Sequence, residues 1–187
     1  YTGVNNSNWD TIISNAVRNK ITSINSNSDI QYNQKMLFVH AAGNGAQHCG
    51  SASITDCDYF ATLYSKVRAQ GYEIGQDTIF VGSLSDGGTS MAPYSYQAGS
   101  IPKDFIVAHD DVLFSGDASG TSFSAPRVVG TAALLRQKFP NLNGTQIKQV
   151  ILQTATDLGT SGPDEVYGYG ELNIENAMSP QGKVTVK

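Results

Sequence analysis

The chain has 187 residues, of which 40% are hydrophobic and 15% charged, with 19 glycines and a formal net charge of −4. This composition suits one domain of ordinary size and excludes a disordered chain or a coiled coil. The acidic balance provides no basic surface for nucleic acid, and no apolar run approaches membrane-spanning length. The chain opens on Tyr1 rather than Met, without a charged segment that leads into an apolar one, which indicates a processed or excised piece.

The first half of the chain predicts two helices and one strand. Apolar residues at helical spacing predict an amphipathic helix over about residues 9–20, with Asn8 as its N-cap. After a polar loop, the short run KMLFVHAAGN has the pattern of a strand buried on both faces of a parallel sheet. A second helix is expected over residues 59–67, before Gly71.

The second half continues the alternation of strands and helices. DTIFVGS and DFIVAHD are two further strands of the buried type. A helix that is apolar nearly all round is predicted over residues 122–138, with Pro126 in its first turn. Asn143 or Thr145 caps a further helix.

This alternation implies βαβ units, and hence a three-layer αβα domain with a mostly parallel sheet. No repeat or interdomain linker divides the chain. We therefore expect residues 1–178 to form one unit, with residues 179–187 as a tail or an edge strand. In such sheets, functional groups gather at the carboxyl ends of strands and at helix N-termini.

The two cysteines, Cys49 and Cys57, share a loop rich in Gly, Ser and Asp. Their spacing favours a loop-closing disulfide in an exported protein, and two unrelated thiols are the alternative. No zinc site is expected, because His48 adjoins Cys49 but no second pair completes a tetrahedral ligand set.

Two polar residues lie at the positions where functional groups gather in such a sheet, one after a strand and one at a helix start. Asn44 follows the first buried strand on a turn between Gly43 and Gly45, either as a turn residue or as a rigidly held N–H donor. Ser122 begins a helix, either as an N-cap or as a nucleophile at a site that favours negative charge. Together they supply what acyl transfer needs, a hydroxyl that attacks and an amide that donates to the oxyanion.

These segments resemble the subtilisin-like serine proteases, the subtilases of peptidase family S8. GTSFSAPRVVGTAALL resembles the family's nucleophile motif, AAGNG its oxyanion-hole segment, and GYGELNIENA its closing motif. GVNNSNW resembles the segment that lines the peptide-binding groove, without the glycine that usually follows its serine. The resemblance covers most of residues 3–178 and implies a subtilisin-like fold that lacks the N-terminal part of the domain.

The resemblance also implies roles for individual residues. Ser122 would be the nucleophile, and Asn44 would form the oxyanion hole together with the backbone N–H of Ser122. A protein or peptide substrate would then lie along six further residues: Ser7, Asn8, Ala42, Gly43, Gly120 and Thr121.

The family's aspartate and histidine motifs are both absent from this chain. None of the three histidines, His40, His48 and His109, lies in a matching context, and His109-Asp110-Asp111 stands where the family typically has Ala-Pro-Gly. A serine without a base is a poor nucleophile. The expected function is therefore that of a serine endopeptidase whose Asp and His lie in an upstream segment of the same precursor. This chain alone should be nearly inactive.

Two other functions compete with this interpretation. One is a catalytically dead subtilase-like module that binds peptides or proteins, against which the intact Ser122 and Asn44 argue. The other is an esterase-like hydrolase of another fold, whose Gly-x-Ser-x-Gly elbow the chain lacks.

The chemistry of a subtilase requires no cofactor. Structural calcium is common in the family, but the loop acids make up no recognisable ligand set, so no metal site is assigned: Asp56, Asp58, Asp86 and Asp157. The resemblance and the candidate disulfide imply export, so the protein is expected to be secreted, extracellular or on the cell surface.

Overall fold

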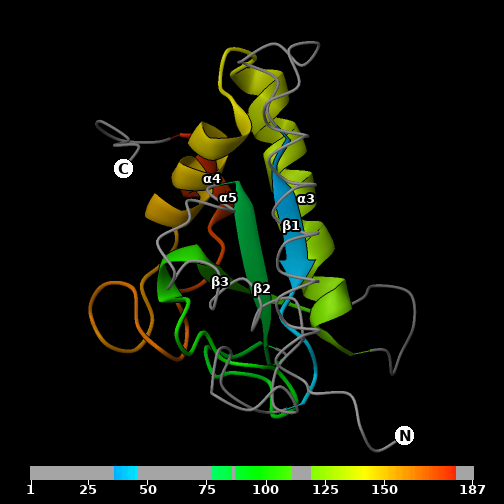
Figure 1. Cartoon of the computed structure of the whole chain (residues 1–187), viewed down its shortest axis with the longest axis vertical. Helices are drawn as coiled ribbons and strands as arrows, with labels where there is room; N and C mark the ends of the chain where they lie inside the picture. The colour runs from blue at the N-terminus through cyan, green and yellow to red at the C-terminus, as the bar shows by residue number, and fades with distance from the viewer. Residues whose placement is uncertain (1–35, 46–76, 86, 111–118, 180–187) are drawn as a thin grey trace, which may run out of the picture.

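The computed structural model describes residues 36–45, 77–85, 87–110 and 119–179, which are coloured in Figure 1. Several predictions lie outside these residues: the helices at 9–20 and 59–67, Ser7, Asn8, the Cys49–Cys57 pair, His48, Asp56, Asp58, Asp86 and the tail after residue 179.

The described sheet has three parallel strands in the order β1 (Phe38–Ala41), β2 (Thr78–Leu84) and β3 (Phe105–His109). All three strands that the buried apolar runs predict are confirmed. All seven residues of β2 are buried, because this strand has a neighbour on each side. β1 is only half-buried, which differs from its prediction, because among the described strands it pairs with β2 alone.

Two of the described helices were predicted from the apolar pattern, α3 (Thr121–Lys138) and α4 (Gly144–Gln153). The short 3-10 turn η2 (Pro102–Asp104) was not predicted, and α5 (Ile174–Met178) lies in the closing motif GYGELNIENA. The cap of α4 is Asn143 rather than Thr145. Its side chain accepts from the Gln146 N–H at 2.9 Å, while the Gln146 side chain accepts from the Asn143 N–H at 2.9 Å. The predicted place of Pro126 is wrong. It is the sixth residue of α3, past the first turn, so it withholds from the Ser122 carbonyl the N–H that a helix normally supplies.

The two faces of the sheet pack against different parts of the chain. One face meets α3, α4 and α5, and its core comprises Ile79, Val81, Ile106, Ala108, Val128, Leu135, Ile147, Val150, Ile151, Leu152 and Ala177. In the described part of the chain, the other face is covered by loop side chains, with a core of Ala42, Phe80, Leu84, Ala98, Ile101, Phe105 and Val107. The strands are therefore enclosed as a parallel sheet requires.

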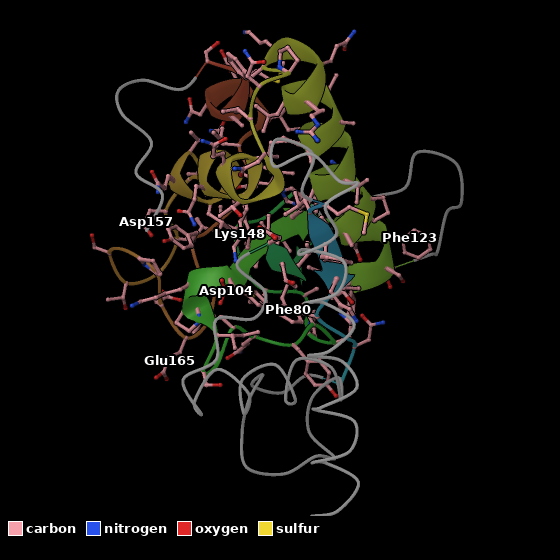
Figure 2. The ribbon with its side chains drawn as sticks, turned by 45° about the horizontal axis from the view of Figure 1, so that its top comes forward. Phe80, Asp104, Phe123, Lys148, Asp157 and Glu165 are labelled. Atoms are coloured by element: carbon pink, nitrogen blue, oxygen red, sulfur yellow. The ribbon has the colours of Figure 1, made fainter. Side chains whose placement is uncertain are left out.

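A buried ion pair ties α4 to the start of β3. Lys148 on α4 donates to Asp104 of η2, and the two residues are only 1% and 4% exposed (Figure 2). Charges at this depth persist only when they are paired, because their desolvation is costly.

The closing segment extends the sheet beside β3. The Tyr169 N–H donates to the Phe105 carbonyl at 3.0 Å, and the Leu172 N–H donates to the Val107 carbonyl at 2.8 Å. Gly168 has a φ of 62°, and a Cβ there would collide with the Phe105 carbonyl, so the tight turn before this pairing requires glycine.

α3 begins at the end of the sheet toward which β1 points (Figure 1). The buried residues of α3 form one stripe along the helix: Thr121, Ser124, Val128, Thr131 and Leu135. The outward face stays open, with Val129 50% and Leu134 45% exposed, although the sequence is apolar nearly all round. The arrangement brings Ser122 to the same end of the sheet as Asn44.

Candidate active site

Asn44 is held on a tight turn at the carboxyl end of β1. Ala42 is fully buried and its N–H donates to the Val81 carbonyl at 2.9 Å, which continues the pairing of β1 with β2. Gly43 then adopts a φ of 106°, which L side chains rarely reach, and turns the chain outward. Its carbonyl accepts from the Tyr96 N–H at 3.1 Å. Asn44 is thereby exposed on a backbone fixed at two points.

Thr121 joins this turn to the start of α3. The backbone N–H of Thr121 donates to Asn44 Oδ1 at 2.9 Å, and its hydroxyl donates to the same oxygen at 3.1 Å. The hydroxyl also accepts from the Gly43 N–H at 3.1 Å. Because a backbone N–H can only donate, the Asn44 atom that it meets must be the amide oxygen. The amide nitrogen is thus turned to the other side.

The Asn44 amide and the Ser122 hydroxyl lie close to each other over Gly120. A Cβ placed on Gly120 would lie 3.4 Å from Asn44 Nδ2, 3.6 Å from Asn44 Oδ1 and 3.5 Å from Ser122 Oγ, so the amide and the hydroxyl border the same space. Gly120 has a φ of 148°, so a side chain there would be strained, although a Cβ would make only ordinary van der Waals contacts with its neighbours. The backbone conformation at this point therefore favours glycine.

Ser122 is exposed in the first turn of the 18-residue helix α3. Its backbone N–H has no hydrogen-bond partner among the described residues, and the positive end of the helix dipole favours negative charge there. An oxyanion in front of Ser122 would thus meet two donors, the Asn44 amide and this N–H. Phe123, the next residue, marks the start of α3 in Figure 2.

Neither described histidine hydrogen-bonds Ser122. His109 Nε2 lies 3.2 Å from Glu171 Oε1 in the closing segment. His40 Nδ1 lies 2.7 Å from the Ala41 carbonyl oxygen, and its ring packs on Phe80 with the centroids 5.5 Å apart. Both side chains thus have partners away from the serine, as expected for structural histidines.

The predicted substrate-binding residues take different positions in the structure. Ala42 is fully buried, and Thr121, which is 1% exposed, lies beneath Asn44 with its side chain turned away from solvent. Gly43 and Gly120 shape the backbone on either side of the site. Thr121 supports Asn44, a role that the residue's identity alone does not signal.

Three residues that hydrogen-bond near the start of α3 were not predicted as site residues: Asp110, Tyr94 and Ser83. Asp110 accepts from the Gly120 N–H at 2.8 Å and from the Tyr94 hydroxyl, and Ser83 Oγ lies 3.2 Å from that hydroxyl. Asp110 directly follows β3, and its place at the carboxyl end of a strand is the signal that could have identified it. Tyr94 lies in an irregular loop, where no pattern indicates its contacts.

No metal site and no membrane-crossing helix is found in residues 36–45, 77–85, 87–110 and 119–179. No three His, Cys, Asp or Glu side chains gather there in a way that could hold a metal ion. Asp157, one of the loop acids, accepts from the Gly162 N–H at 2.8 Å. No helix in the same residues is long and apolar enough to cross a bilayer.

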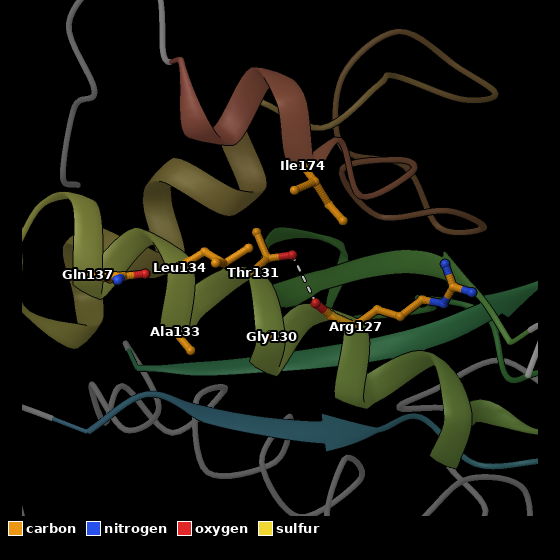
Figure 3. Close-up of a pocket in the computed structure, with 7 residues that line it drawn as sticks. All are labelled: Arg127, Gly130, Thr131, Ala133, Leu134, Gln137 and Ile174. Carbon is orange, nitrogen blue, oxygen red and sulfur yellow. Dashed lines mark hydrogen bonds between the residues drawn. The ribbon is translucent and has the colours of Figure 1, made fainter. Parts of the chain in front are cut away.

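A shallow hollow of about 440 Å³ lies on the outward face of α3 (Figure 3). Its lining is apolar for the most part and comprises Arg127, Gly130, Thr131, Ala133, Leu134, Gln137 and Ile174. This hollow includes neither Ser122 nor Asn44. The candidate active site lies elsewhere, at the exposed edge where β1 ends and α3 begins.

A parallel sheet with a serine at a helix start and an asparagine amide at the same edge is an arrangement on which α/β serine hydrolases can build an oxyanion hole. The family model described as Subtilase family matches residues 3–170, and the chain belongs to this family.

Curated relatives agree with this assignment. The Neisserial autotransporter lipoprotein NalP of Neisseria meningitidis serogroup B is 31% identical in an alignment of 167 residues that covers 79% of this chain and 14% of that protein. An extracellular serine protease of Serratia marcescens is 48% identical over 64 residues, 34% of this chain and 6% of that protein. Subtilisin DY of Bacillus licheniformis is 28% identical over 156 residues, 83% of this chain and 52% of that protein. The chain thus spans about half or less of each of these relatives.

Solved structures show the fold. A chain in the structure of the subtilase cytotoxin SubAB superposes with a TM-score of 0.62 at 21% identity, covering 89% of this chain and 53% of that one. The self-cleaved protease domain of PatA gives a TM-score of 0.58 at 22% identity, covering 89% and 54%. The three-layer, subtilisin-like α/β fold expected from the sequence is confirmed.

Proposed function

We propose that the protein is a serine endopeptidase that cleaves peptide bonds through an acyl-enzyme on Ser122. The observation that carries this proposal is the orientation of Asn44. Two donors from Thr121 hold its amide oxygen, at 2.9 and 3.1 Å, which leaves the amide nitrogen to donate elsewhere, and the amide borders the same space over Gly120 as the Ser122 hydroxyl. A turn asparagine with only a structural role needs no such orientation toward an exposed serine.

In the proposed reaction, Ser122 Oγ attacks the carbonyl carbon of the scissile peptide while its proton passes to a histidine. The tetrahedral oxyanion accepts from Asn44 Nδ2 and from the Ser122 N–H. The histidine returns the proton to the leaving amine, and water then releases the acyl group from the serine. Gly43 and Gly120 would border the bound substrate, Ala42 would support this border from its buried position, and Ser7 and Asn8 would flank the extended chain of the substrate.

Neither His40 nor His109 hydrogen-bonds Ser122, and the sequence around His48 does not match the family's histidine motif. We propose that an upstream segment of the same precursor supplies the histidine, together with the aspartate that orients it. Without that segment Ser122 lacks a base, and the chain alone should turn over substrate only marginally.

We further propose that the protein is secreted or held on the cell surface. Its relatives include a protease named as extracellular and an autotransporter lipoprotein. The Cys49–Cys57 disulfide would suit such an oxidising location.

The test compares kcat and substrate binding of the Asn44→Ala variant with those of the unaltered enzyme, both in the whole protein to which this chain belongs. Because the amide acts on charge that develops in the transition state, kcat should fall far more than substrate binding weakens. In a subtilisin, a member of this family, loss of one oxyanion-hole donor costs about 10²–10³-fold in kcat, which sets the scale. An equal loss in kcat and binding would contradict the oxyanion role, and a Ser122→Ala variant with full turnover would contradict the nucleophile.

A further inference from the structure

Asp110 is a buried carboxylate for which the proposed reaction has no use. It directly follows β3 and is only 4% exposed. In the described part of the chain, its carboxylate has two donors, the Gly120 N–H at 2.8 Å and the Tyr94 hydroxyl, and it pairs with no cation. Burial of a carboxylate without a cation costs free energy, so we looked for a role in the hydrogen bonds that Asp110 accepts.

The hydrogen bonds around Asp110 form a chain with one direction. Since the carboxylate can only accept from Tyr94, the Tyr94 oxygen is left to accept from Ser83 Oγ at 3.2 Å. Ser83 in turn accepts from the Ser124 hydroxyl at 3.1 Å. Every hydroxyl thus donates toward Asp110, an arrangement in which successive hydrogen bonds strengthen one another.

This chain of hydrogen bonds meets α3 at two points that flank Ser122. Asp110 binds the N–H of Gly120, two residues before the serine, and Ser83 binds the side chain of Ser124, two residues after it. Gly120 is the N-cap of α3 and has no side chain with which to cap the helix, although Asn44 Oδ1 accepts from the next N–H, that of Thr121, at 2.9 Å. The φ of 148° at Gly120 is a conformation that the glycine does not fix by itself. The Asp110 carboxylate therefore fixes a turn that local sequence leaves free.

We propose that Asp110 is a positioning residue for the nucleophile. Its charge-assisted hydrogen bond to the Gly120 N–H, supported by Tyr94, sets the direction in which α3 starts. The Ser122 hydroxyl is thereby held beside the Asn44 amide. This inference rests on the proposed role of Ser122, and it concerns how the serine is placed rather than how it reacts.

The experiment compares Asp110→Ala, Asp110→Asn and Tyr94→Phe in the whole protein, with Asp164→Ala as a matched control. Asp164 also accepts from backbone N–H groups, at 2.7–2.9 Å, but its partners all lie within its own loop. Three quantities are measured for each variant: kcat and KM per titrated active site, the melting temperature, and the hydrogen-exchange rate of the Gly120 amide.

Asp110→Ala should lower kcat by about 10–100-fold with KM changed less than about threefold, because a displaced nucleophile loses rate rather than affinity. Asp110→Asn should recover kcat to within about threefold, since an amide oxygen still accepts from Gly120. The Gly120 amide should exchange faster in Asp110→Ala only. Asp164→Ala should lower the melting temperature while kcat is retained.

An Asp110→Ala enzyme with unchanged kcat, or one in which Gly120 exchange is unaltered, would overturn the positioning role. If that variant does not fold, Tyr94→Phe decides: a kcat lower by about three- to tenfold supports the role, and an unchanged kcat refutes it. If even the unaltered protein shows no turnover, the proposed function fails instead. The exchange of Gly120 then still tests whether Asp110 holds the turn.

Discussion

Substitution of Thr121 by Val removes one hydroxyl from beneath the active site and keeps the shape of the side chain. That hydroxyl accepts from the Gly43 N–H and donates to Asn44 Oδ1, each at 3.1 Å. The backbone N–H of Thr121 still donates to Asn44 Oδ1 at 2.9 Å. The amide should therefore keep its orientation but lose one of its two supports.

The magnitude follows from these contacts. A typical intramolecular hydrogen bond contributes about 0.5–1.5 kcal/mol, and a buried donor left unpaired costs about 1–3 kcal/mol. Gly43 is only half-buried, so water recovers part of that cost. We expect the free energy of unfolding to fall by about 1–2 kcal/mol, and kcat to fall by about tenfold or less. This loss is much smaller than the one expected for Asn44→Ala.

The assay measures kcat and KM on a chromogenic peptide and stability by urea unfolding, in the whole protein. Thr121→Ser is the matched control, because it keeps the hydroxyl and should restore both kcat and stability. Thr121→Val with unchanged kcat would show that the hydroxyl does not support Asn44. A loss as large as that of Asn44→Ala would show that the backbone N–H alone cannot orient the amide.

Two further predictions concern ionisable side chains beside β3. Lys148→Met leaves Asp104 buried without its cation and should lower the free energy of unfolding by about 3–5 kcal/mol. A second change, Asp104→Leu, should restore much of that free energy. Urea unfolding measures both, and a Lys148→Met variant with unchanged stability would contradict the role of the pair. Burial, and to a smaller extent the Asp104 carboxylate, raises the pKa of Tyr169 above its ordinary value of 10.0. The folded chain then holds the phenol proton more tightly than the unfolded chain, so the stabilisation is complete below pH 10 and is lost as the pH rises through the native pKa. Tyr169→Phe should reduce this alkaline decline in the free energy of unfolding, which urea unfolding at a series of pH values measures. An equal decline in both proteins would show that another group causes it.

The sequence predicted the elements whose pattern is local. The strands β1, β2 and β3 are short apolar runs, α3 is apolar nearly all round, and α4 carries an apolar stripe after the cap signal of Asn143, so both kinds of element were located correctly. Asn44 and Ser122 were predicted to act together, because the carboxyl ends of parallel strands and the N-termini of helices gather at one edge of a sheet. Their relative placement in the structure agrees with that rule.

The connections beneath the site could not be predicted, because they depend on residues far apart in the chain. The hydroxyl of Thr121 meets Gly43 across 78 positions, and Ser124 meets Ser83 across 41. No periodicity indicates that the Tyr94 hydroxyl reaches Asp110, since Tyr94 lies in a loop with no repeating pattern. The apolar sequence of α3 predicted burial all round, yet only the face against the sheet is covered in the described structure.

The central claim is that Ser122 is a nucleophile whose activity depends on a base outside this chain. Treatment with a fluorophosphonate probe, followed by mass spectrometry of the labelled peptide, tests it in the chain alone and in the protein with the upstream segment that carries the Asp and His. We predict that Ser122 is labelled only when the upstream segment is present, and that Ser122→Ala abolishes the label. The absence of label at Ser122 under both conditions would contradict the claim, as would equal labelling in the chain alone.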